Sequence, residues 1–206
     1  MHRYLIPDAL LVDAQTYLRG HALLVDGSRV LDLVPAESAP EAASVRFEGE
    51  LWTAAPLLLH AHLESHDAPC LVWPRESFAA WVERLLEWRE NGARMDAEVS
   101  ATESLRELAA GACGLVVTHV AEPGAAGGHL EDPVLPEIAA FPEFFVPEPA
   151  DADEVLRAID ARPPAAHGGF ALHAPFSVSE ALARGVFARA RGWDVPVSVH
   201  LGEHSE

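Results

Sequence analysis

Five short apolar segments, recurring from Pro56 onward, most constrain how this chain can fold. Apolar strand, loop and amphipathic helix alternate along this region, and the last four strand candidates begin about 25 to 29 residues apart. The predicted strands span residues 57–62, 115–120, 144–147, 170–173 and 195–201. Parallel strands need a crossover connection, usually a helix, and this spacing suits repeated βα units. The sequence therefore predicts an α/β fold built on a parallel sheet.

Helix signals lie between these strands. Residues 77–91 carry apolar side chains at helical spacing, namely Phe78, Trp81, Val82, Leu85 and Leu86. Asp151 and Ser177 each precede a glutamate by three positions, which is the capping-box pattern and predicts a helix start at each. Residues 122–136 contain glycines and prolines and are predicted to form a long loop.

The first 52 residues follow a different pattern. Short apolar runs at 9–12, 21–25 and 30–34 are broken by turn signals such as Asp26-Gly27. This pattern predicts a small β region. We therefore expect two domains, a β portion over residues 1–52 and an α/β portion over residues 53–206.

Charge and composition exclude several classes of function. Fourteen basic residues face 32 acidic ones, giving a net charge of −18, so nucleic-acid phosphates would be repelled. No apolar run approaches the roughly 20 residues that span a bilayer, and no secretory signal opens the chain, so we expect no membrane segment. With only two cysteines, Cys70 and Cys113, reduced thiols and a cytoplasmic location are expected.

The chain contains no lysine, because all 14 basic residues are arginine. This absence excludes a Schiff-base lysine, a P-loop lysine and a metal bridge made by a carbamylated lysine.

Histidines cluster at the ends of the predicted strands. In parallel α/β barrels the reactive groups lie at the carboxyl ends of strands, so these side chains are expected to converge. They are His60, His62, His119, His173 and His200.

The His60-Ala61-His62 sequence carries the sharpest metal signal. Residues i and i+2 of a strand point to one face, so both imidazoles can reach one ion at about 2.0–2.1 Å, the Zn–N distance. His200 could complete a three-nitrogen set, and Glu203 could move protons beside the ion. The alternatives are a chance HxH pair, a hydrogen-bonded core histidine at 200 and a solvated carboxylate at 203. His119 carries a weaker signal, and His173 suits either substrate binding or a structural role.

Three segments resemble the metal-dependent amidohydrolase superfamily, in the branch of nucleobase and aminofutalosine deaminases and triazine chlorohydrolases. They read PLLLHAHLE at 56–64, ALHAPFSVS at 171–179 and VHLGEHSE at 199–206. The resemblance extends over essentially the whole chain and implies a TIM-type (β/α) barrel preceded by part of a small β-sandwich domain.

The resemblance also implies roles for individual residues. His60, His62 and His200 would bind one divalent metal, zinc or iron, and Glu203 would be the catalytic proton carrier. His173 and Glu64 would contact a heteroaromatic small molecule. The implied reaction is hydrolytic deamination, or a related C–N or C–Cl hydrolysis.

Two departures from the family pattern stand out. Leu57 and Leu58 replace the glycine and asparagine usual before HxH, and the family's histidine of barrel strand six and metal-binding aspartate of strand eight lie beyond residue 206. We therefore expect an incomplete barrel of strands 1–5, whose open edge a second chain or another copy would cover. The competing prediction is a catalytically inactive remnant that binds metal or assembles with a partner. A phosphotriesterase-like hydrolase is disfavoured, because its bridged site needs lysine.

Overall fold

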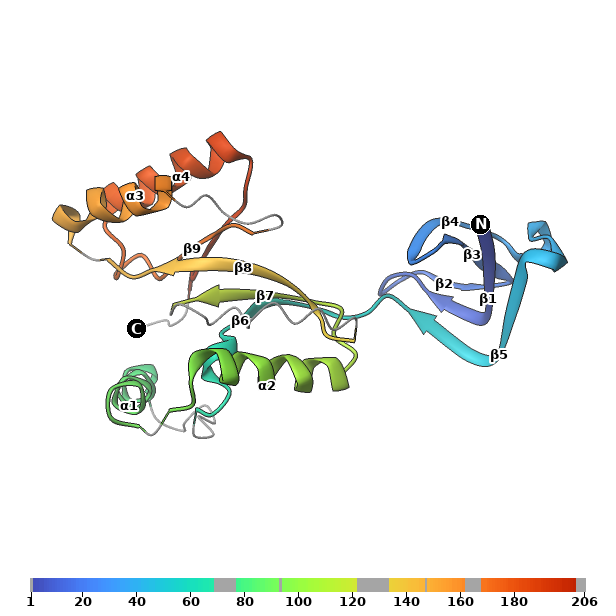
Figure 1. Ribbon diagram of the computed structural model, residues 1–206, viewed down its shortest axis with the longest axis horizontal. Coiled ribbons are helices and arrows are strands. Elements are labelled where there is room, and N and C mark those ends of the chain that lie inside the picture. The colour runs from blue at the N-terminus through green and yellow to red at the C-terminus, as the bar shows by residue number, and fades with distance from the viewer. Residues whose placement is uncertain are drawn as a thin grey trace. The chain divides into compact units, whose positions relative to one another are not determined.

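A computed structural model describes residues 2–68, 77–92, 94–121, 134–146, 148–161 and 168–202 of the chain (Figure 1). The chain divides into two compact units, Met1–Ala55 and Pro56–Glu206. Within the described residues, the first unit is all β apart from two single-turn 3₁₀ helices, and the second combines a parallel sheet with four α-helices.

The first unit is a five-stranded mixed sheet organised around its first strand. Strand β1 pairs antiparallel with β2 and β3 and parallel with β5, while β4 extends the sheet beyond β3. The strands are β1 (His2–Leu11), β2 (Tyr17–Arg19), β3 (His21–Asp26), β4 (Arg29–Pro35) and β5 (Ser44–Thr53), with η1 (Ala36–Ser38) and η2 (Glu41–Ala43) between the last two. The sequence analysis missed β2 and β5, and it found only the end of β1.

The second unit contains a sheet of five strands, all parallel and in the order β10-β9-β8-β7-β6. These strands are β6 (Leu57–Ala61), β7 (Leu115–Val120), β8 (Glu137–Phe144), β9 (Phe170–Leu172) and β10 (Val197–Val199). Because consecutive strands are neighbours, the sheet has the connectivity of a (β/α) barrel. The predicted fold, an incomplete TIM-type barrel after a small β portion, is confirmed.

Four α-helices belong to this sheet. Figure 1 shows α3 and α4 together near β8 and β9, and α1 and α2 together near β6. The helices are α1 (Phe78–Asn91), α2 (Ala97–Ala110), α3 (Ala152–Ala161) and α4 (Glu180–Trp193), with single 3₁₀ turns at η3 (Leu63–Ser65) and η4 (Pro149–Asp151).

The predicted helix starts lie close to the observed ones, but two of the predicted caps are corrected. Ser77 caps α1 by accepting a hydrogen bond from the backbone N–H of Ala80. The cap of α4 is Ser179 rather than the predicted Ser177, whose hydroxyl instead bonds the carbonyl of Ala174. Asp151 makes no side-chain cap, because the 3₁₀ turn η4 leads directly into α3. Asp96 caps α2, which was not predicted from the sequence.

Most of the predicted 122–136 loop lies outside the described residues.

Strand β8 is the largest correction to the predicted fold. The predicted strand at 144–147 shares only Phe144 with the observed strand. Pro142 explains the error, because proline removes a ladder hydrogen bond and argues against a central strand. Pro142 is nevertheless tolerated, because the register pairs it with Val120 of β7 while β9 pairs only from Glu143 onward. The shift places Glu143 inside the strand, near its carboxyl end.

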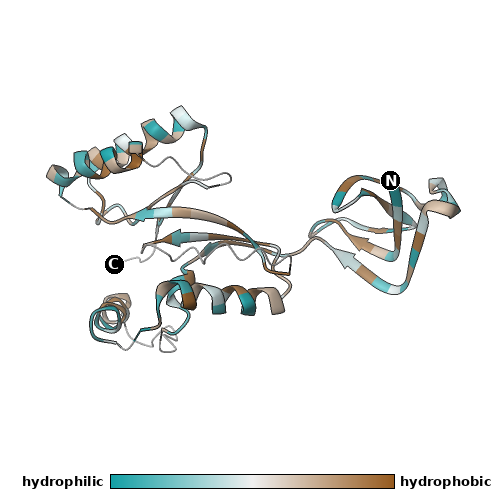
Figure 2. Ribbon diagram, viewed as in Figure 1, coloured by the Kyte–Doolittle hydropathy of each residue, from teal (hydrophilic) through white to brown (hydrophobic). Residues whose placement is uncertain are grey.

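Two apolar clusters hold the helices on the sheet. In one, α3 and α4 pack on β9 through Ile159, Phe170, Leu182 and Val186. In the other, α2 packs Leu105 against Val116 of β7 and Leu63 of η3. Figure 2 shows the bodies of β7 and β8 apolar and their arrowheads hydrophilic. The sheet therefore has an apolar body and a polar carboxyl edge.

No helix within the described residues is long and apolar enough to span a membrane.

A close approach of backbone to backbone yields a stability prediction at Gly169, just before β9. A Cβ atom there would lie 2.5 Å from the carbonyl oxygen of Pro196 and 2.7 Å from the ring of Phe141. We expect Gly169→Ala to lower the free energy of unfolding by about 1–3 kcal/mol, because such overpacking displaces the backbone before β10. Urea denaturation of the purified chain measures this loss.

Gly192 in α4 is the matched control. A Cβ there meets nothing within 4 Å, so Gly192→Ala should be neutral or stabilise by up to about 1 kcal/mol through helix propensity. Equal effects of the two substitutions would contradict the packing argument.

Candidate metal centre

Four histidines from the carboxyl edge of the parallel sheet converge in space. One potential ligand atom from each of His60, His62, His119 and His200 lies within 4.8 Å of all the others. His60 is on β6, His62 directly follows it, His119 is on β7 and His200 directly follows β10. Because all five strands run in the same direction, their carboxyl ends meet at one edge, and this edge brings the histidines together.

The three predicted metal ligands belong to this cluster. The ring centroids of His60 and His62 lie 5.2 Å apart, and the ring of His200 lies 4.7 Å from His60 and 5.9 Å from His62. The β6–β7 register shifts between Leu58 and Ala61, so the irregularity falls at Leu59 and His60. Such irregularities re-aim side chains and are common next to functional sites.

The surroundings of His60 favour a neutral imidazole. Although His60 is exposed at the open side of the cluster, desolvation by its neighbours lowers its pKa to about 4. The charges that His119, His62 and His200 can carry act in the same direction. A neutral ring offers a lone pair at neutral pH, and metal binding requires that form.

His119 lies in the cluster although its sequence signal was weak. Its side chain is fully buried, and its ring centroid is 4.3 Å from that of His60. Its Nδ1 is hydrogen-bonded to Oε1 of Glu143 at 3.2 Å, and its Nε2 to the hydroxyl of Ser198 at 2.9 Å.

Glu143 is the functional candidate that the sequence analysis missed. Its Oε1 also lies 3.4 Å from Nδ1 of His200. Burial raises the pKa of Glu143, but the hydrogen bond from His119 and the charges of His62, His200 and His119 outweigh burial and hold the pKa below its ordinary value. A correct boundary for β8 would have revealed this residue as one more polar side chain at a strand end.

Glu64 is buried beside the cluster, with 1% of its surface exposed. Its Oε1 lies 3.5 Å from Nδ1 of His62. Within the described part of the chain, neither carboxylate oxygen of Glu64 nor Nδ1 of His62 has a hydrogen bond of good geometry. Buried polar atoms left unsatisfied are costly, so this corner of the cluster has unmet capacity for a ligand.

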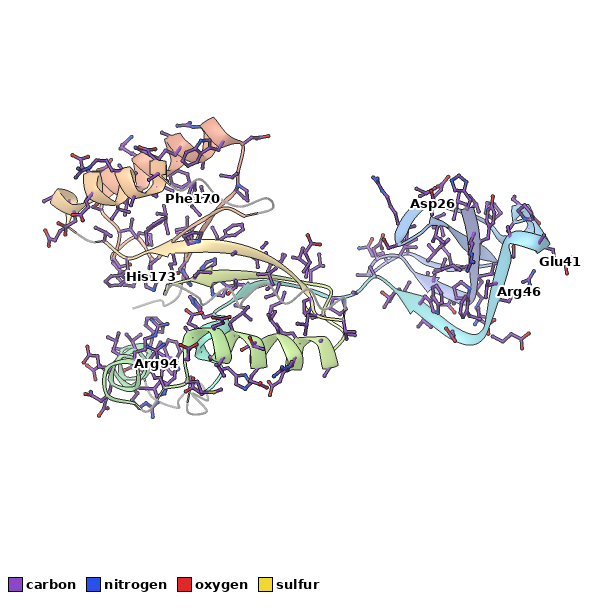
Figure 3. All side chains as sticks on the ribbon, in the orientation of Figure 1. Asp26, Glu41, Arg46, Arg94, Phe170 and His173 are labelled. Carbon is purple, nitrogen blue, oxygen red and sulfur yellow. The ribbon has the colours of Figure 1, made fainter. Side chains whose placement is uncertain are left out.

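His173 lies next to the cluster, with its ring centroid 5.0 Å from that of His200. Figure 3 labels His173 at the end of the parallel sheet, where β8 and β9 finish. Its Nδ1 is hydrogen-bonded to the hydroxyl of Ser177 at 2.6 Å, and its ring contacts the rings of Phe145 and Phe176. Glu203, the predicted proton carrier, lies outside the described residues.

The donor set suits a divalent transition metal. Imidazole nitrogen is a ligand that zinc and iron accept, and three protein nitrogens with one open position are typical of catalytic zinc sites. The unmet hydrogen-bonding capacity at His62 and Glu64 fits a centre that takes up further groups. The cluster could therefore hold one metal ion.

No protein-family model matches the chain, and no curated protein matches its sequence. Solved structures do match. Helicobacter pylori aminofutalosine deaminase in complex with methylthio-coformycin has 16% identity and a TM-score of 0.71, with 96% of this chain and 50% of that chain covered. An adenosine deaminase from Xanthomonas campestris with bound zinc has 16% identity and a TM-score of 0.62, covering 98% and 49%. A triazine hydrolase variant has 18% identity and a TM-score of 0.64, covering 96% and 52%.

The chain spans about half the length of these solved structures. At such low identity the likeness is one of fold, and it agrees with the connectivity of the parallel sheet and with the histidine cluster at its carboxyl edge. The resemblance predicted from the three sequence segments is thereby confirmed at the level of fold: over about half the length of those enzymes, the chain shares their fold.

Proposed function

We propose that this chain forms the metal-binding half of a metal-dependent hydrolase that deaminates a heteroaromatic small molecule. The observation that carries the proposal is the convergence of His60, His62 and His200 at the carboxyl edge of a parallel sheet. This edge is where barrel enzymes of this type hold their reactive groups.

In this proposal His60, His62 and His200 hold one divalent ion, zinc or iron. Bound there, the ion supplies Lewis acidity that turns water into a nucleophile near neutral pH. Glu203 takes a proton from the attacking water and delivers it to the ring nitrogen of the substrate. The water oxygen forms a bond to the carbon that carries the amino group. The remaining hydroxyl proton passes to the amino group, and the C–N bond then breaks to release ammonia as the carbonyl forms. Displacement of another leaving group would follow the same course.

The hydrogen bonds of His173 support a role in substrate binding. The Ser177 hydroxyl donates to the carbonyl of Ala174, so its oxygen accepts from Nδ1–H of His173. Nε2 of His173 is then an acceptor, suited to an N–H or O–H group of the substrate. The unsatisfied carboxylate of Glu64 is a second acceptor for a substrate donor, and the ring of Phe145 beside His173 suits a planar ligand.

The proposal includes a complementary portion that completes the barrel. Among the described strands β6 pairs only with β7 and β10 only with β9, and Leu57 and Leu59 of β6 are 63% and 67% exposed. Exposed apolar edge strands invite pairing, which supports a second chain, another copy or a further segment at the edges of the sheet.

We also propose a cytoplasmic location, because the chain has only two cysteines.

The proposal predicts metal binding. The metal-free chain should bind one equivalent of zinc, and alanine at His60, His62 or His200 should each weaken binding at least 100-fold, because each removes one of three nitrogen ligands. Competition with a chromophoric chelator measures the affinity.

His2→Gln is the matched control, since His2 is an exposed histidine of the first unit. It should leave zinc affinity unchanged. Binding that survives all three alanine substitutions would contradict the proposed ligand set.

The proposal also predicts deamination. With three further βα units supplied in trans or by fusion, the zinc-loaded protein should release ammonia from amino-substituted purines or nucleosides. His173→Gln should raise KM roughly tenfold, the worth of one substrate hydrogen bond, while zinc stoichiometry stays at one. Continuous measurement of ammonia release checks both effects.

A completed barrel that holds zinc but hydrolyses none of the heteroaromatic amines or halides would overturn the proposed chemistry. That outcome would favour the competing prediction of a remnant that binds metal without catalysis.

A further inference from the structure

We propose that Glu143 is the positioning residue of this metal centre, fixing the rings of His119 and His200 through one carboxylate oxygen. The inference rests on the proposed metal-binding function and assigns a role to strand β8, which supplies none of the predicted ligands. It also assigns His119 a supporting role rather than that of a fourth ligand.

The contacts of Glu143 link three strands. From β8, its Oε1 lies 3.2 Å from Nδ1 of His119 on β7 and 3.4 Å from Nδ1 of His200 after β10. All three side chains are largely shielded from solvent: the exposed fraction is 6% for Glu143, 1% for His119 and 12% for His200. A carboxylate in such a setting interacts more strongly with its partners than it would at the surface.

The contacts of Glu143 assign the ring protons. A carboxylate only accepts hydrogen bonds, so Nδ1 of His119, which bonds Glu143 at 3.2 Å, carries hydrogen. Nδ1 of His200 lies 3.4 Å from the same oxygen, and the proposal assigns it the same protonated form. Each neutral ring then keeps its lone pair on Nε2. In His119 this lone pair accepts the Ser198 hydroxyl at 2.9 Å, and in His200 it is the proposed ligand atom for the ion.

His119 is therefore occupied at both nitrogens and serves to hold Glu143 in place. Ser198 precedes His200 by two positions along β10, so the two residues point to the same face of that strand. The carboxyl end of β10 is therefore contacted at two residues. Ser198 bonds His119, and His200 lies against Glu143.

A similar pairing at the opposite side of the centre supports this role. Oε1 of Glu64 lies 3.5 Å from Nδ1 of His62. Two of the three proposed ligands, His62 and His200, therefore have a buried carboxylate near Nδ1. A carboxylate behind a metal-binding imidazole orients the ring and raises its basicity, and its loss typically costs 10- to 100-fold in metal affinity.

Zinc titration of Glu143→Gln tests the proposal. The variant should bind zinc about 10- to 100-fold more weakly than the unmodified chain, with stoichiometry still one. Glu137→Gln, an exposed glutamate on the same strand, should leave the affinity unchanged. Glu143→Asp, which keeps the charge, should recover part of the loss.

X-ray absorption of the zinc-loaded chain distinguishes a positioning residue from a ligand. Glu143→Gln and His119→Phe should both preserve the number of nitrogen ligands. Loss of one ligand in either variant would overturn the assigned role of that residue, and unchanged zinc affinity in Glu143→Gln would overturn the proposal itself.

A metal-free measurement separates this inference from the proposed function. Nitrogen-15 spectra of the histidine rings in the metal-free chain should show His119 and His200 protonated on Nδ1, and Glu143→Gln should alter both signals. If Glu143→Gln does not fold, Glu143→Asp decides: affinity equal to that of the unmodified chain overturns the inference. Failure of the unmodified chain to bind zinc would instead overturn the proposed function.

Discussion

The parallel pairing of five consecutive strands is the constraint on which the rest of the second unit depends. Neighbouring strands lie about 4.8 Å apart, so the outer strands of a flat five-stranded sheet would be separated by roughly 19 Å. Yet the ring of His60 on β6 lies 4.7 Å from that of His200 after β10, at the opposite end of the strand order. Side chains can bridge part of that distance, but strong curvature must supply the remainder. The histidine cluster is thus a consequence of a sheet that curls as barrels do.

Burial of charged groups at this edge of the sheet has a cost that the cluster itself offsets. Glu143 is shielded from water, and burial alone would raise its pKa, but the hydrogen bond from His119 and the nearby imidazoles hold it below the ordinary value. Glu64 has no such hydrogen bond in the described part of the chain. A carboxylate retained in that condition is destabilising on its own. Burial of this carboxylate beside the proposed ligands agrees with its proposed role in binding a further group.

The sequence predicted the fold well where periodicity was strong and failed where a single residue broke the pattern. Strand β7 was located at its observed bounds, because its apolar run is continuous. Strand β8 was misplaced because Pro142 interrupts it, and this error concealed Glu143. His60, His62 and His200 could be singled out because HxH spacing and strand-end position carry chemical meaning. The contribution of His119 depends on long-range contacts with Glu143 and Ser198, which no local pattern in the sequence encodes.

The position of the proposed ligands relates metal binding to the stability of the half-barrel. His60 and His62 lie at the end of one outer strand, β6, and His200 directly follows the other, β10. An ion held by all three would therefore join the two strands that are paired on one side only among the described residues. The inner strands β7 and β8 are held by ladders on both sides, whereas β6 and β10 are each paired on one side only among the described residues. The free energy of metal binding would therefore act on the strands that backbone pairing holds from one side. Because an ion that binds only the folded form adds its binding energy to folding, the metal centre would help to maintain the curvature that creates it.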